Sequence, residues 1–187
     1  MSVRDVFQRI VLALDRAGIE YMLSGSFASA YYGAARSTQD IDLVIHASPA
    51  QLTTFVNALP SNEYYANLDA ALEAYRRKSM FNLIDLPTGW KIDLIVRKSR
   101  DYSLGEFARR TQVTLHGVGV FIATAEDAVI SKLEWAKLGE SPRQIEDVAA
   151  ILRVRGDMLD QSYLENWISK LGLGDEWEKA RAAAGLF

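Results

Sequence analysis

The chain has 187 residues, of which 49% are hydrophobic and 24% are charged, and its formal net charge is −3. These values are typical of a soluble globular domain with or without a helical extension, and the small negative charge argues against a protein that coats nucleic acid non-specifically. The chain has no cysteine, which excludes disulfides and thiolate ligands, and no apolar run that approaches the ~18 residues of a membrane-spanning helix, so we expect a cytoplasmic protein without a membrane partner.

The first 123 residues combine helical and strand patterns. Apolar residues recur at helical spacing over residues 3–17, and Gly18 ends this helix. Ser48 and Pro49 are typical of the start of a helix, which we expect to run to Leu59. The pattern predicts further helices at residues 27–32, 69–78 and 104–110, and strands at residues 20–23, 41–45, 80–86, 90–96, 113–115 and 118–122.

The strand signal ends near Thr124, where Thr124-Ala125-Glu126-Asp127 resembles a capping box for a helix that reaches about Leu138. Pro142 opens the next helix, and two more are expected at residues 163–171 and 175–184. We therefore expect an α/β core over residues 1–123 and a helical C-terminal region over residues 124–187 that packs on the core.

Two aliphatic segments of the expected core carry acidic residues. They read Asp40-Ile41-Asp42-Leu43-Val44-Ile45 and Ile92-Asp93-Leu94-Ile95-Val96. Side chains two apart on a strand share a face, so Asp40 and Asp42 should project together, and Asp93 joins them if the two strands are neighbours. Converging carboxylates repel one another, and a hard divalent cation relieves that repulsion. The pattern therefore predicts a Mg2+ site, with Mn2+ as a substitute.

The pair Gly25-Ser26 lies between an expected strand and an expected helix. Glycine lets the backbone approach a ligand closely, a helix N-terminus offers free N–H groups to an anion, and Ser26 adds a hydroxyl donor. A phosphate-binding turn followed by a strand with two carboxylates is the arrangement that nucleotidyl transfer requires.

These motifs together resemble those of a known superfamily. Gly25-Ser26, thirteen intervening residues, Asp40-x-Asp42 and a third Asp on a later strand are similar to the motif of the nucleotidyltransferase superfamily, whose founding member is DNA polymerase β. The passage over residues 23–45 looks like the minimal prokaryotic branch that includes the abortive-infection type toxins of type IV toxin–antitoxin systems. In the second half, Lys132, Arg143 and Glu146-Asp147 are loosely similar to the family's helical pattern.

The resemblance implies an α/β nucleotidyltransferase fold with a mixed sheet, followed by a C-terminal helical domain. It implies an enzyme that moves NMP from an NTP to a hydroxyl of RNA or protein with release of pyrophosphate, with a cognate antitoxin or regulator as a further partner. The metal would be held by Asp40, Asp42 and Asp93, and Asp93 would also help to activate the acceptor hydroxyl.

The resemblance also implies which residues bind the nucleotide. Gly25 and Ser26 would hold the β- and γ-phosphates, and Arg36 or Lys132 would neutralise triphosphate charge. Asp147 would contact the nucleotide or brace Lys132. In the absence of a ligand, Arg36 could instead pair with a surface carboxylate, and Lys132 could be an exposed helix residue.

Two other functions stay open at this point. One is a catalytically silent nucleotide-binding or antitoxin-like regulatory module, and the other is an adenylyltransferase for a small molecule such as an aminoglycoside. Residues 76–110 carry nine Lys or Arg and four Asp or Glu, which is typical of a solvated face but mildly favours RNA or protein over a cationic drug. His46 and His116 lack the spacing of metal ligands and should be structural or solvent-facing.

Overall fold

The computed structural model describes residues 3–35, 37–139 and 141–186. The chain divides into two compact units, one formed by Met1–Ser24 with Thr38–Ile122 and the other by Gly25–Ser37 with Ala123–Phe187. None of the described helices has both the length and the apolar character that a membrane crossing needs.

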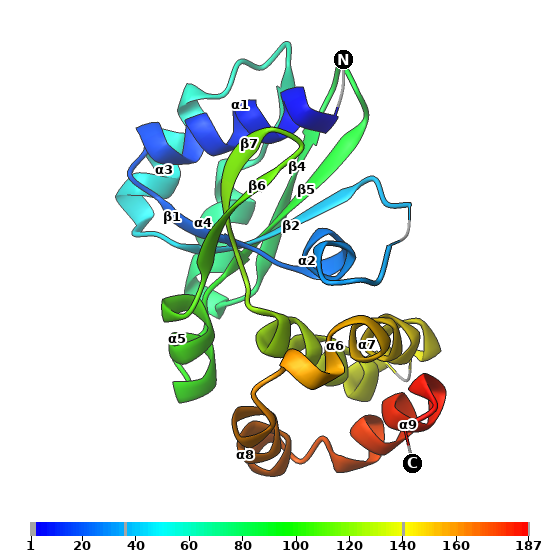
Figure 1. Ribbon diagram of the computed structural model, residues 1–187. Coiled ribbons are helices and arrows are strands. Elements are labelled where there is room, and N and C mark those ends of the chain that lie inside the picture. Colours follow the sequence, from blue (N-terminus) through cyan, green and yellow to red (C-terminus); the bar gives the residue numbers. More distant parts are fainter. Residues whose placement is uncertain (1–2, 36, 140, 187) are drawn as a thin grey trace. The chain divides into compact units, whose positions relative to one another are not determined.

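A mixed sheet is the centre of the first unit (Figure 1). Among the described residues it has seven strands in the order β3-β4-β5-β2-β1-β7-β6. The pairs β2·β5 and β1·β7 are parallel and the others are antiparallel, which confirms the predicted α/β class with a mixed sheet. The strands are β1 (Glu20–Leu23), β2 (Asp40–His46), β3 (Tyr64–Tyr65), β4 (Met80–Asp85), β5 (Trp90–Val96), β6 (Thr111–Leu115) and β7 (Val118–Ile122).

Helices cover one face of this sheet and build the core there. α1 (Val3–Arg16) contacts β1 and β7, α4 (Leu68–Arg77) contacts β4 and β5, and α3 (Pro49–Ala58) contacts both helices. α5 (Asp101–Ala108) follows β5. The strand residues on the covered face are aliphatic or aromatic and at most 5% exposed: Ile41, Leu43, Ile45, Phe81, Leu83, Ile92, Leu94 and Val96. Residues alternate between faces along a strand, so the intervening residues of β2 and β5 lie on the opposite face.

Local sequence explains most of the element boundaries. The helix start predicted at Ser48 is confirmed, and the structure shows a capping box there, because Ser48 Oγ accepts from the Gln51 backbone N–H and Gln51 Oε1 accepts from that of Ser48. α5 begins three residues before the predicted start, at Asp101, whose negative charge is favourable in a first helical turn. β3 was not predicted, since two residues are too few to show an alternating pattern.

The second unit is helical. Its elements are α2 (Gly25–Tyr31), α6 (Ala125–Gly139), α7 (Pro142–Arg155), a 3-10 turn (Gly156–Met158), α8 (Gln161–Leu171) and α9 (Gly174–Ala184). α2 packs on α6 and α7, and Tyr32 Oη donates a 2.8 Å hydrogen bond to the Ala123 carbonyl. The short segment after β1 thus belongs with the C-terminal helices, while the predicted domain boundary at residue 123 stays a prediction.

Candidate active site on strands β2 and β5

The face of the sheet opposite α1, α3 and α4 carries a group of four neighbouring charged residues, Asp40, Asp42, Lys91 and Asp93. The parallel register pairs Asp40 with Lys91 and Asp42 with Asp93. Because each strand contributes two residues that are two positions apart, all four side chains leave the sheet on the same side. The structure therefore brings Asp42 and Asp93 side by side, as the sequence pattern predicted, and places Asp40 at the adjacent position of β2.

The three acidic residues of this group differ in solvent exposure. Asp40 is exposed, Asp42 is intermediate, and Asp93 is only 6% exposed. Asp93 Oδ2 accepts a 2.8 Å hydrogen bond from Lys91 Nζ. Asp93 Oδ1 is buried and has no hydrogen-bond partner among the described residues. A buried carboxylate oxygen without a partner is unfavourable, so this atom is suited to an additional ligand.

Lys91 is the member of this charged group that the acidic sequence motif does not include. The hydrogen bond that Lys91 donates to Asp93 raises the pKa of Lys91 above its usual value, and the negative charges of Asp93, Asp40 and Asp42 raise it further against the opposing effect of burial. The Lys91 ammonium thus interacts electrostatically with all three carboxylates. The signal was present in the sequence, because Lys91 precedes Asp93 by two positions and must share its face.

The donor set fits a hard divalent cation. Carboxylate oxygens are the preferred ligands of Mg2+, and Asp40, Asp42 and Asp93 are the residues that would hold it. The unpartnered Oδ1 of Asp93 points to the same conclusion. Across residues 3–35, 37–139 and 141–186, however, no three acidic, histidine or cysteine side chains are already gathered as a metal site.

Gly25 and Ser26 directly follow Ser24, which is hydrogen-bonded to β2. Within the first unit, the Ser24 backbone N–H donates a 2.9 Å hydrogen bond to the Asp42 carbonyl. Gly25 has a φ of +59°, a left-handed conformation that glycine adopts without strain. Ser26 is buried and its carbonyl accepts a hydrogen bond from Ser29 Oγ. The predicted phosphate contacts of these two residues stay predictions, and Arg36 lies outside the described residues.

Lys132 lies in the helical unit and is paired. Its Nζ is 2.7 Å from Asp147 Oδ2, and both side chains are buried, at 6% and 7% exposure. The alternative that Lys132 is an exposed helix residue is therefore wrong, and Asp147 braces it as the resemblance suggested. Its contact with a triphosphate stays a prediction.

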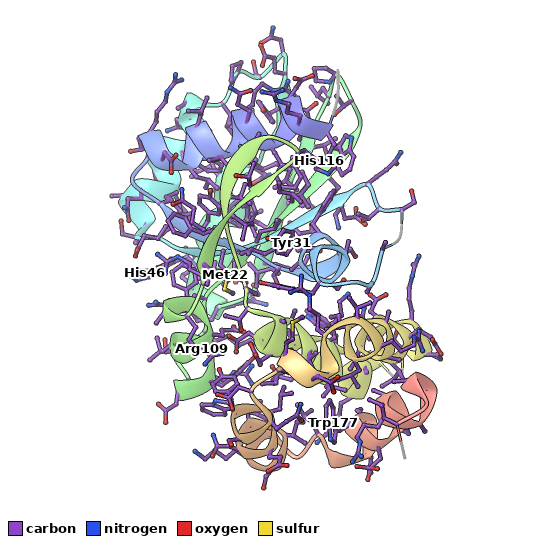
Figure 2. The ribbon with its side chains drawn as sticks, viewed as in Figure 1. Met22, Tyr31, His46, Arg109, His116 and Trp177 are labelled. Atoms are coloured by element: carbon purple, nitrogen blue, oxygen red, sulfur yellow. The ribbon has the colours of Figure 1, made fainter. Side chains whose placement is uncertain are left out.

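The two histidines occupy different parts of the first unit (Figure 2). His46 ends β2, where its Nδ1 lies 3.2 Å from Glu20 Oε2, and His116 lies in the β6–β7 turn with its ring stacked near Phe7. They lie on different elements and contact different residues, and the prediction that they are structural or solvent-facing stays a prediction.

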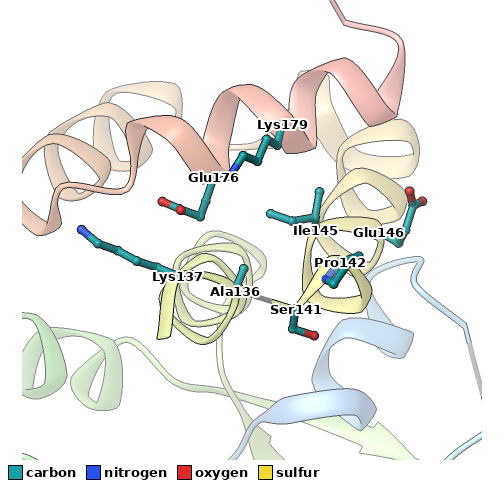
Figure 3. Close-up of a pocket in the computed structure, with 8 residues that line it drawn as sticks. All are labelled: Ala136, Lys137, Ser141, Pro142, Ile145, Glu146, Glu176 and Lys179. Carbon is teal, nitrogen blue, oxygen red and sulfur yellow. The ribbon is translucent and has the colours of Figure 1, made fainter. Parts of the chain in front are cut away.

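A hollow of about 570 Å³ lies within the helical unit (Figure 3). It is bounded by α6, the start of α7 and α9, and two lysines and two glutamates, Lys137, Lys179, Glu146 and Glu176, line it. Its charges are balanced, and none of the predicted catalytic or nucleotide-binding residues that the structure describes lines it, so we do not assign the nucleotide to it.

Comparison with known proteins supports the fold. No family model and no curated protein matches the sequence. An antigenic nucleotidyltransferase-like protein from Paracoccidioides brasiliensis is similar in structure over 92% of this chain and 90% of its own, with a TM-score of 0.52 and 20% identity. The antibiotic-resistance factor ANT(2'')-Ia is similar over 97% of this chain and 88% of its own, with a TM-score of 0.51 and 14% identity. The chain thus has the nucleotidyltransferase fold that the sequence resemblance implied.

Proposed function

We propose that the protein is a Mg2+-dependent nucleotidyltransferase that moves NMP from an NTP to an acceptor hydroxyl and releases pyrophosphate. The observation that carries this proposal is the pairing of Asp42 with Asp93 in register, with a buried and unpartnered oxygen on Asp93. Buried polar atoms are normally satisfied, so this oxygen favours a ligand that the chain itself does not supply. The fold supports the proposal.

The chain's own residues divide the work. Asp40 and Asp42 hold the metal from β2, and Asp93 holds it from β5 and accepts the proton of the acceptor hydroxyl. The acceptor oxygen bonds to the α-phosphorus while the bond from that phosphorus to the bridging oxygen of pyrophosphate breaks. When bound, the metal supplies positive charge that neutralises the triphosphate and the departing pyrophosphate.

The triphosphate is the second part of the proposal. Gly25 and Ser26 hold the β- and γ-phosphates through backbone N–H groups and a hydroxyl, and Arg36 or Lys132 supplies positive charge. What supports this assignment is the sequence resemblance, together with the left-handed φ of Gly25.

We propose RNA or protein as the acceptor and a toxin of a toxin–antitoxin pair as the biological setting, with a cognate antitoxin or regulator as partner. The basic stretch over residues 76–110 supports an anionic acceptor. The second candidate is a small-molecule adenylyltransferase, which the fold likeness to an antibiotic-resistance factor favours. The third is a silent nucleotide-binding regulator.

Replacement of Asp42 by alanine tests the proposed function. Labelled NTPs, Mg2+ and either total RNA, cell protein or an aminoglycoside are incubated with wild type, Asp42→Ala and the control Asp15→Ala, which removes an exposed carboxylate on α1. We expect Asp42→Ala to lower transfer by about 100-fold or more, because transition-state charge loses a fixed counter-charge, and Asp15→Ala to behave as wild type.

The three acceptors separate the candidate functions. Label on RNA or protein supports the first, and label on the aminoglycoside supports the second. Binding of NTP that releases no pyrophosphate in the presence of any of the three acceptors would identify a regulator. Equal transfer by wild type and Asp42→Ala contradicts the catalytic assignment.

A further inference from the structure

Lys91 occupies the charge centre of the candidate site. Its Nζ lies 2.8 Å from Asp93 Oδ2, and its backbone is paired with Asp40 in the parallel ladder. Asp42 is the neighbour of Asp93 on the same face. A single ammonium therefore neutralises part of the charge of three carboxylates that would otherwise repel one another.

An ammonium and a divalent cation compete for such a position. Both are attracted by the same carboxylates and each repels the other, so a metal that binds Asp93 weakens or breaks the contact with Lys91. The two partners differ in freedom to move. The side chain of Asp93 is 8% exposed and lies on a central strand, whereas the side chain of Lys91 is 41% exposed, long and flexible. Lys91 is the partner that can withdraw.

We propose that Lys91 is an internal counter-ion that takes the place of the metal in the metal-free protein and withdraws when a divalent cation binds. Lys91 then lowers the affinity of the site for metal and keeps the carboxylates compatible with folding before metal arrives. The inference rests on the proposed function, because it requires Asp40, Asp42 and Asp93 to be the metal site.

Metal affinity provides the direct test. The free Mn2+ signal in electron paramagnetic resonance gives the dissociation constant for wild type, Lys91→Met, Lys91→Gln and Lys91→Arg, in the absence of nucleotide. We expect both neutral variants to bind Mn2+ about two- to fivefold more tightly, which corresponds to the loss of a half-exposed ion pair, and Lys91→Arg to remain near wild type. The gain should shrink at high salt.

Two further variants test whether the change in Mn2+ affinity is specific to Lys91 and whether Mn2+ binds at Asp93. Lys98→Met removes the same charge from an exposed position of the same unit and should leave Mn2+ affinity unchanged. Asp93→Asn removes a ligand and should abolish the tight Mn2+ site. Equal or weaker Mn2+ binding by the neutral Lys91 variants, or an equal gain in Lys98→Met, overturns the counter-ion role.

Thermal unfolding gives a readout that is independent of metal affinity. In EDTA, Lys91→Met should unfold at a lower temperature than wild type, because Asp93 loses its partner, and saturating Mn2+ should close the gap. A gap that persists in saturating Mn2+ contradicts displacement. If wild type and Asp93→Asn bind Mn2+ equally, the proposed function fails and the inference fails with it. If wild type binds Mn2+ through Asp93 and transfers nucleotide while Lys91→Met binds no tighter, only the inference fails.

Discussion

At the scale of single residues, two carboxylates are buried in the sheet and their surroundings differ. Asp85, at the end of β4, is fully buried on the helix-covered face. Arg9 of α1 donates to its Oδ2, and Thr88 Oγ1 donates to its Oδ1 at 2.6 Å. Arg9 Nε also donates to Tyr64 Oη at 3.1 Å. Both oxygens of Asp85 are satisfied within the chain, so this carboxylate joins α1 to the sheet, whereas Asp93 Oδ1 has no hydrogen-bond partner among the described residues.

Removal of Arg9 should therefore destabilise the protein. In Arg9→Met the Asp85 carboxylate stays buried without its cation, and we expect the free energy of unfolding to fall by about 3 kcal/mol. Arg16→Met is the matched control, since Arg16 is exposed on the same helix, and its effect should be within about 0.5 kcal/mol. Urea denaturation measures both. Equal stability of the two variants would show that Asp85 does not depend on Arg9.

Residue periodicity predicted part of the candidate site. The alternation along the two aliphatic segments indicated that Asp40, Asp42 and Asp93 share a face, and the register agrees. The same rule applies to Lys91, but a search for acidic ligands does not include a lysine. The partner of Lys132 could only be guessed, because Asp147 is fifteen positions away on the next helix and the pairing depends on how the two helices pack.

At the scale of elements, helix α3 begins with a complete capping box. Ser48→Ala removes the acceptor for the Gln51 N–H and should lower the free energy of unfolding by about 1 kcal/mol. Ser48→Gly should lower it by only a few tenths of a kcal/mol, because glycine is tolerated at the N-cap. Thermal unfolding of the three proteins distinguishes these values. Equal losses in the two variants would contradict the expected tolerance of glycine at this N-cap position.

Elements with strong local signals were the ones predicted well. α3 has a cap and Pro49, and β4 and β5 are joined by a turn with Gly89 at a φ of +73°. β3 exists because its two residues pair with the end of β4, which is a tertiary contact and leaves no local pattern. The grouping of α2 with α6 and α7 is likewise a matter of packing and not of sequence composition.

At the scale of the whole molecule, ligand binding should raise the free energy of unfolding. A ligand at about 100 times its dissociation constant stabilises the native state by about 2.7 kcal/mol. For a chain of this length we expect Mg2+ with a non-hydrolysable NTP analogue to raise the Tm by about 5–10 °C. Differential scanning calorimetry measures the shift, and Asp42→Ala should show none. A shift of the same size in Asp42→Ala would locate the nucleotide elsewhere.

The register between β2 and β5 also determines which changes of length the chain can tolerate. If one residue were deleted inside β2, the part of the strand beyond the deletion would turn over, so that side chains such as Leu43 and Ile45 would exchange faces with Asp42 and Val44. Leu43 and Ile45 would then leave the helix-covered core, and Asp42 would enter it. The spacing of the acidic residues is thus maintained by the packing on the other side of the sheet, and an insertion or deletion in either strand should be far more damaging than any single substitution on the charged face.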